Sequence, residues 1–134
     1  MPYSFVVDTF TWVEYVIGSR RGKAAKTYIE SGKASTPMIV LMETCQVFLR
    51  EIESGRRTLQ DLNQAFDFIR TTTFVVDLDE ALARKVGEAD FLMKKKVRNW
   101  PMAGSMVHAT AAVHGSRVVT GDPHFKSVEN SVII

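Results

Sequence analysis

The chain has 134 residues, the usual size of one domain, and we expect a single domain over residues 1–134. Hydrophobic residues make up 46% and charged residues 24%, which is typical of a globular protein and too apolar for a disordered chain. The net charge of only +2 excludes a strong general attraction to nucleic acid, so any contact with phosphate must come from local basic patches.

The single cysteine, Cys45, cannot form an internal disulfide, which fits a reducing compartment. No apolar run approaches the roughly 18–20 residues that a membrane span needs. The first apolar stretch, residues 5–7, is too short for a signal peptide. We therefore expect a soluble, cytoplasmic protein that does not bind membranes.

Short β-rich runs alternate with helical patterns. In chain order, we predict a strand at residues 3–7, helices at 9–16, 23–30, 37–54 and 59–70, a strand at 71–76, helices at 78–96 and 102–114, and strands at 116–120 and 132–134. Thr36 and Pro37 are interpreted as the N-cap and first residue of the third helix. Asp77 and Glu80 are interpreted as a capping box. This alternation predicts an α/β fold with a mostly parallel sheet of four to five short strands and helices on both faces.

Three aspartates follow predicted strands, and such positions matter because ligands of open α/β sheets bind beyond the carboxyl ends of the strands. They are Asp8, Asp77 and Asp122. Each is also well placed to cap the helix that follows, most clearly Asp122, which precedes a proline. The residues alone do not separate capping from ligand binding, nor one aspartate from the others.

Glu43 lies in the middle of a predicted helix, with apolar neighbours at Ile39, Val40 and Val47. A carboxylate on an apolar face must find a partner or lose its charge. A basic side chain or a divalent cation would serve, since carboxylate oxygens suit Mg²⁺ and Mn²⁺.

Four ordered segments resemble the successive blocks of a PIN domain, most closely those of prokaryotic VapC-type toxins. They are FVVDTFTWVEY, STPMIVLMETCQVFLREI, VVDLDEALARKVGEADFL and PMAGSMVHATAAVHGSRVVTGDPHF. The resemblance implies a Mg²⁺- or Mn²⁺-dependent ribonuclease, with Asp8, Glu43 and Asp122 as catalytic and metal-binding residues. It also implies a homodimer and a VapB-like antitoxin on a separate chain.

One position departs from the family pattern, because Gly104 stands where the family usually has a further aspartate. A glycine offers no side-chain oxygen, although water can replace one, since Mg²⁺ usually keeps several waters. Ser105 is adjacent but points about 100° away around the helix, so we do not expect it to substitute. Three explanations stay open: a working site with reduced metal affinity, a naturally inactive relative, or a deliberate inactivation of a toxic protein.

Two basic runs are candidates for contact with an RNA backbone, although each also suits a solvated helix face. They comprise Lys94, Lys95, Lys96 and Arg98, and Arg20, Arg21, Lys23 and Lys26. His108 lies one turn after Gly104 and is a weaker candidate for facing the site.

Two functions of different class are therefore weighed. The first is a metal-dependent endoribonuclease toxin, favoured by the three acids. The alternative is a catalytically impaired PIN-like module that binds RNA or protein, favoured by Gly104. A flavodoxin-like response domain ranks below both, because the late lysine and the paired first acids that it requires are missing.

Overall fold

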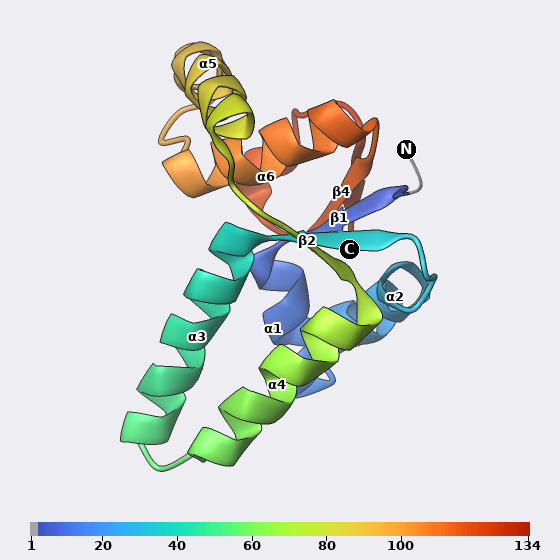
Figure 1. Ribbon diagram of the computed structural model, residues 1–134, viewed down its shortest axis with the longest axis vertical. Coiled ribbons are helices and arrows are strands. Elements are labelled where there is room, and N and C mark those ends of the chain that lie inside the picture. Colours follow the sequence, from blue (N-terminus) through green and yellow to red (C-terminus); the bar gives the residue numbers. More distant parts are fainter. Residues whose placement is uncertain (1–2) are drawn as a thin grey trace.

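A computed structural model describes residues 3–134, which form one parallel five-stranded sheet with helices on both faces (Figure 1). The strand order is β3-β2-β1-β4-β5, and all four strand pairs are parallel. The strands are β1 (Phe5–Val7), β2 (Ala34–Pro37), β3 (Phe74–Val76), β4 (Arg117–Thr120) and β5 (Ser131–Ile133). The predicted α/β class and parallel sheet are confirmed.

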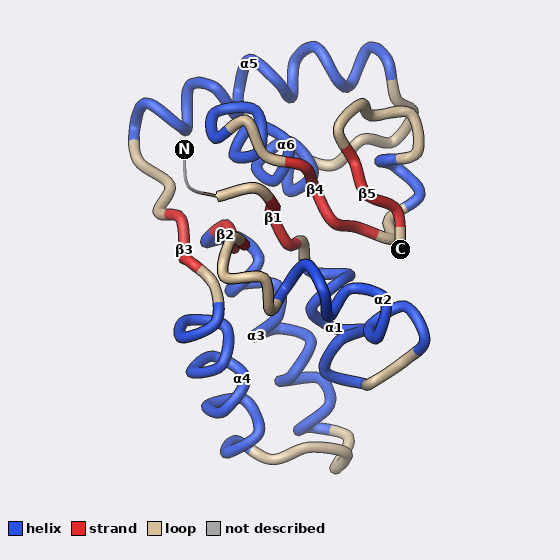
Figure 2. The backbone as a smooth tube through the Cα atoms, turned by 90° about the vertical axis from the view of Figure 1, so that its right-hand side faces the viewer, coloured by secondary structure: helices blue, strands red, loops and turns tan. Residues whose placement is uncertain are grey.

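The helices form two layers that sandwich the sheet (Figures 1 and 2). One layer holds α1 (Thr9–Ile17), α2 (Arg20–Ile29), α3 (Met38–Glu53) and α4 (Leu59–Thr72); the other holds α5 (Glu80–Lys96) and α6 (Met102–His114). A short 3₁₀ helix, η1 (Pro123–Phe125), follows β4. No helix within residues 3–134 is both long and apolar enough to cross a membrane.

The central strands form the middle of the core. Val6 and Val7 of β1 and Val118 and Val119 of β4 are all at most 2% exposed. Strands of a parallel sheet are covered on both faces, so consecutive residues can all be apolar. Because β1 leads to β2 on one side and borders β4 on the other, the strand order reverses between β1 and β4. Ligands of such sheets bind at this reversal, beyond the strand ends.

Strand β2 was not predicted, and the interpretation of Thr36 as an N-cap is wrong. Ser35 and Thr36 are fully buried strand residues, and helix α3 begins at Met38 without a side-chain cap. The Thr36 hydroxyl is 2.7 Å from that of Thr73 and accepts a hydrogen bond from the Trp12 indole at 3.2 Å. These hydrogen bonds satisfy buried polar groups of the strand and so offset the cost of burying them. They join residues far apart in the sequence.

The predicted capping box of Asp77 and Glu80 is also wrong. Asp79 is the N-cap of α5, and its side chain accepts a hydrogen bond from the backbone N–H of Leu82 at 2.8 Å. The predicted end of α6 at His114 is confirmed, with Gly115 in the left-handed conformation at φ 62°. Glycine pays no steric penalty there.

Candidate active site

Asp8 follows β1 directly and lies at the point where the strand order reverses. It caps α1, because its Oδ1 accepts a hydrogen bond from the backbone N–H of Thr11 at 3.0 Å. Its Oδ2 accepts a hydrogen bond from the hydroxyl of Thr120, the last residue of β4. Asp8 is only 6% exposed, so its carboxylate is held rigidly and is almost removed from water.

Burial raises the pKa of Asp8 from its ordinary value of 3.8 to about 6. The hydrogen bonds from Thr120 and Thr11 lower this pKa, and the nearby charge of Asp122 raises it. The loss of hydration therefore outweighs the hydrogen bonds that favour the anion. A cation beside Asp8 would replace the lost hydration and favour the charged form.

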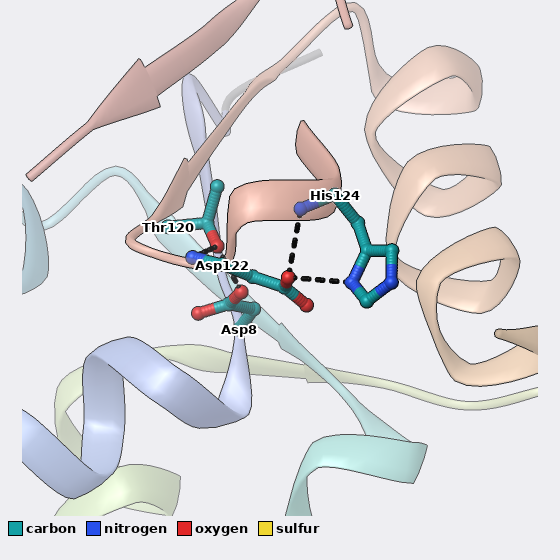
Figure 3. Close-up of polar contacts among 4 residues, drawn as sticks. All are labelled: Asp8, Thr120, Asp122 and His124. Atoms are coloured by element: carbon teal, nitrogen blue, oxygen red, sulfur yellow. Dashed lines mark hydrogen bonds and ion pairs between the residues drawn. The ribbon is translucent and has the colours of Figure 1, made fainter. Parts of the chain in front are cut away.

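Asp122 follows β4 and reaches the same end of the sheet (Figure 3). Its backbone N–H donates to the Thr120 hydroxyl oxygen at 2.9 Å, so Thr120 links the two aspartates. Its Oδ1 accepts the backbone N–H of His124 at 2.9 Å and lies 2.7 Å from His124 Nδ1. Asp122 is thus both the cap of η1 and a neighbour of Asp8.

Glu43 reaches the site from the middle of α3. Its Oε1 accepts a hydrogen bond from the hydroxyl of Thr9 at 2.6 Å. No ion pair to Glu43 occurs among residues 3–134, and its side chain is half-buried. Among the described residues, Glu43 thus has a hydroxyl donor and no basic partner.

The three acids line one cavity of about 170 Å³. Its other walls come from the start of α1, the start of α6 and the end of η1; they are Thr9, Phe10, Pro101, Ala103, Gly104, Val107 and Phe125. Within residues 3–134, no group of three or more His, Cys, Asp or Glu side chains is close enough together to enclose a metal ion. The carboxylate oxygens that line the cavity are of the donor type that Mg²⁺ and Mn²⁺ prefer, but they do not by themselves form a closed metal site.

Gly104 lines this cavity, and its missing side chain is matched by an indole ring. A Cβ at this position would lie 3.1 and 3.2 Å from two carbon atoms of the Trp100 side chain, closer than ordinary van der Waals contact. Trp100 is 2% exposed and donates its indole N–H to the Ser105 hydroxyl at 2.7 Å. Position 104, where the family usually has a carboxylate, is therefore packed against the buried Trp100 ring.

Other sequence candidates lie outside the cavity. Asp77 is exposed beyond β3, two strands away from β1, which agrees with its absence from the acids that the family resemblance implied. Ser105 is fully buried and donates to Asp90 at 2.9 Å, which agrees with its expected direction. His108 does not line the cavity; burial lowers its pKa, and its ring meets Trp100 edge-on.

Two residues at the site were missed by the sequence analysis. His124 touches Asp122, and its position two residues after an aspartate that precedes a proline was an available signal. Phe10 lines the cavity two residues after Asp8, and an apolar residue at this position is equally typical of a helix face that packs in the core. For an aromatic residue near a strand end, the sequence does not show whether the side chain faces the core or a cavity until the orientation of the following helix is known.

Comparisons with known proteins agree with this fold. The PIN domain family profile matches residues 5–130. No curated protein matches the sequence closely enough to count as a relative. Among solved structures, the sarcin-ricin loop cleaving toxin VapC20 of Mycobacterium tuberculosis is 20% identical, with a TM-score of 0.70 and 98% coverage of both chains.

Two further structures are complexes determined with DNA. VapBC of Salmonella typhimurium matches at 17% identity and a TM-score of 0.68, covering 98% of this chain and 97% of that one. VapBC2 of Rickettsia felis, bound to a DNA fragment from its promoter, matches at 14% identity and a TM-score of 0.72, covering 97% and 96%. The predicted resemblance to VapC-type PIN proteins is confirmed, and the chain belongs to the PIN domain family.

Proposed function

We propose that this protein is a divalent-metal-dependent endoribonuclease and the toxin of a VapBC-type pair. The observation that carries the proposal is the convergence of three carboxylates, from the ends of β1 and β4 and from α3, on one cavity. The pKa of Asp8, raised to about 6, adds support, because strongly shifted groups in clefts are typical of functional sites.

In this proposal, Asp8 and Asp122 hold the metal, and Glu43 either holds it or orients the attacking water. A bound Mg²⁺ or Mn²⁺ would supply an activated water and neutralise charge on the attacked phosphate. Thr120 positions both aspartates through its two hydrogen bonds, and Thr9 orients Glu43. The catalytic assignment of Asp8, Glu43 and Asp122 is a proposal.

The proposed partners are RNA, a second copy of the chain and a VapB-like antitoxin, in the cytoplasm. An apolar groove of about 260 Å³ between α1, α3 and α4 suits a peptide segment of the antitoxin. Tyr15 and Phe68 stack in it with centroids 5.6 Å apart, and Trp12 meets both edge-on. Aromatic residues in such a groove are the usual anchors of a protein interface.

A second function is favoured by Gly104, which removes the carboxylate usual at this point and packs against Trp100. It is a catalytically impaired PIN-like module that binds RNA or protein without cutting. The two functions make the same use of the fold and differ in whether three carboxylates and water ligands suffice for catalysis.

Cleavage of an end-labelled RNA panel distinguishes them, with Mg²⁺, Mn²⁺ or EDTA and the variants Asp8→Asn and Gly104→Asp. Metal-dependent cutting by the wild type that disappears in Asp8→Asn supports the three-acid nuclease. Cutting by Gly104→Asp alone supports the impaired module. If neither protein cuts any RNA, the nuclease proposal is rejected.

A further inference from the structure

The ring of Phe10 forms one wall of the acidic cavity and is packed against Gly121, between Thr120 and Asp122. A Cβ at Gly121 would lie 2.3 to 2.9 Å from three ring carbons, so no side chain fits there while Phe10 keeps this position. Gly121 does not have a positive φ, so the ring, rather than the backbone conformation, requires glycine. The ring therefore packs directly on the backbone between Thr120 and Asp122, at the wall of the cavity.

Arg21 of α2 places its guanidinium over this ring, 5.5 Å from the ring centroid. Arg21 is exposed, and no carboxylate pairs with it among residues 3–134. The cation–π contact orients the guanidinium without neutralising its charge. A positive group is thus held next to a wall of the cavity that holds three acids.

The other basic side chains are less well placed for this role. Lys26 pairs with Glu30 at 3.0 Å, and Lys94 pairs with Asp90 at 2.5 Å. Lys95 lies over Phe91, 4.0 Å from the centroid of a ring on α5 that does not line the cavity. Of the two basic runs, only Arg21 contacts a residue of the cavity wall through an interaction seen among residues 3–134.

An RNA backbone entering the cavity brings negative charge toward three carboxylates, and the net charge of +2 gives little general attraction. A guanidinium binds phosphate through two parallel hydrogen bonds. We propose that Arg21, held by Phe10, binds the backbone phosphate next to the one at the acidic site. This rests on the proposed function: Arg21 contacts the substrate, and Phe10 is a positioning residue that acts through Arg21.

Binding in EDTA tests the subsite without cleavage. The probe is a fluorescent ten-nucleotide single-stranded RNA, measured by anisotropy over a series of salt concentrations. For Arg21→Gln we expect roughly five- to tenfold weaker binding at low salt and a salt slope smaller by about 0.7, the loss of one single-strand phosphate contact. The matched control is Arg20→Gln, which removes the same charge from the neighbouring position on α2 and should change the affinity less than twofold.

Two further arms test the pairing. Phe10→Leu keeps an apolar side chain against Gly121 and removes the π face; binding should weaken, and the double variant with Arg21→Gln should bind no worse than Arg21→Gln alone. A further set of RNAs carries one neutral methylphosphonate in place of a backbone phosphate, at a different linkage in each RNA. At one of these linkages the replacement should weaken binding by the wild type and leave the affinity of Arg21→Gln unchanged. Thermal unfolding of each variant checks that the fold is intact.

The results separate this inference from the proposed function. If the protein binds RNA and Arg21→Gln behaves like Arg20→Gln, the subsite is rejected while the nuclease proposal stands. If Arg21→Gln shows the expected losses but no RNA is ever cut, the subsite stands and the nuclease proposal fails. A protein that binds no RNA at all overturns the subsite, and an acidic segment of a protein partner then becomes the better ligand for Arg21.

Discussion

Hydrogen bonds favour the anionic form of Asp8, whereas burial disfavours it, and burial has the stronger effect on its pKa. Its pKa in the folded protein, about 6, is above its ordinary value of 3.8. Between these two pH values the folded state binds more protons than the unfolded state. The stability of the metal-free protein therefore falls as pH rises through this window, and the penalty is complete above about pH 6.

Replacing this carboxylate by an amide should remove the penalty. We expect Asp8→Asn to be more stable than the wild type at pH 7.5 in EDTA, by roughly 1–3 kcal/mol. The difference should shrink as pH falls from 6 to 4, and urea unfolding at several pH values measures it. Asp79→Asn, at the exposed cap of α5, is the control for replacing a cap carboxylate by an amide. A constant difference across this range would contradict the raised pKa.

Position 104 lines the cavity, so a charged side chain there would change the charge of the cavity. Gly104→Asp should bind Mn²⁺ roughly tenfold or more tightly than Gly104→Asn, because the number of carboxylate ligands sets the affinity of such sites. Both variants require the Trp100 ring to yield by a few tenths of an ångström, so they share the packing cost and differ in charge. Titration calorimetry measures the two affinities. Equal values would mean that a side chain at 104 does not reach the ion.

Between α5 and α6, a buried chain of hydrogen bonds fixes the ring beside Gly104. The Trp100 indole donates to Ser105, Ser105 donates to Asp90, and Lys94 pairs with Asp90. The hydrogen bond from Lys94 is the main reason that the pKa of Asp90 is lowered. The network joins the two helices of one layer to the wall of the acidic cavity.

Removing the middle hydroxyl should destabilise this pair of helices. In Ser105→Ala, the buried indole N–H of Trp100 loses its acceptor, and we expect a loss of roughly 1–3 kcal/mol in the free energy of unfolding. Urea denaturation measures this loss. The exposed Ser127→Ala is the control, expected within about 0.5 kcal/mol of the wild type. Equal stabilities of the two variants would show that the network contributes nothing.

Elements with strong local signals were predicted well, and β2 shows why others were not. Helix α6 was predicted with the observed bounds, because an alanine-rich run ends at a glycine. Strand β2 contains two hydroxyl residues and a proline, which locally suggest a helix start. Its burial depends on Thr73 and Trp12, 37 and 24 residues away from Thr36, so no local pattern reveals it.

At the scale of the whole molecule, the helix layer that contains α1, α3 and α4 forms the apolar groove proposed for the antitoxin. Phe68→Ala should weaken binding of a co-expressed VapB-like antitoxin at least tenfold, since aromatic anchors dominate such interfaces. Phe68 is 38% exposed and stacks on Tyr15. The matched control is Phe91→Ala on α5, which is 64% exposed and outside the groove. Similar affinities for the two variants, measured by calorimetry, would place the antitoxin elsewhere.

The sequence by itself determined the class of fold, because local periodicity is carried by neighbouring residues, and its resemblance to a family selected Asp8, Glu43 and Asp122 as candidates. Only the tertiary structure showed how these acids come together. Parallel pairing of β1 with β4 brings Asp8 to Asp122 through Thr120, and the order of the strands leaves Asp77 two strands away. It also decided that Gly104 packs against Trp100 and that Arg21 lies over Phe10, since these contacts depend on how helices cross rather than on any local pattern.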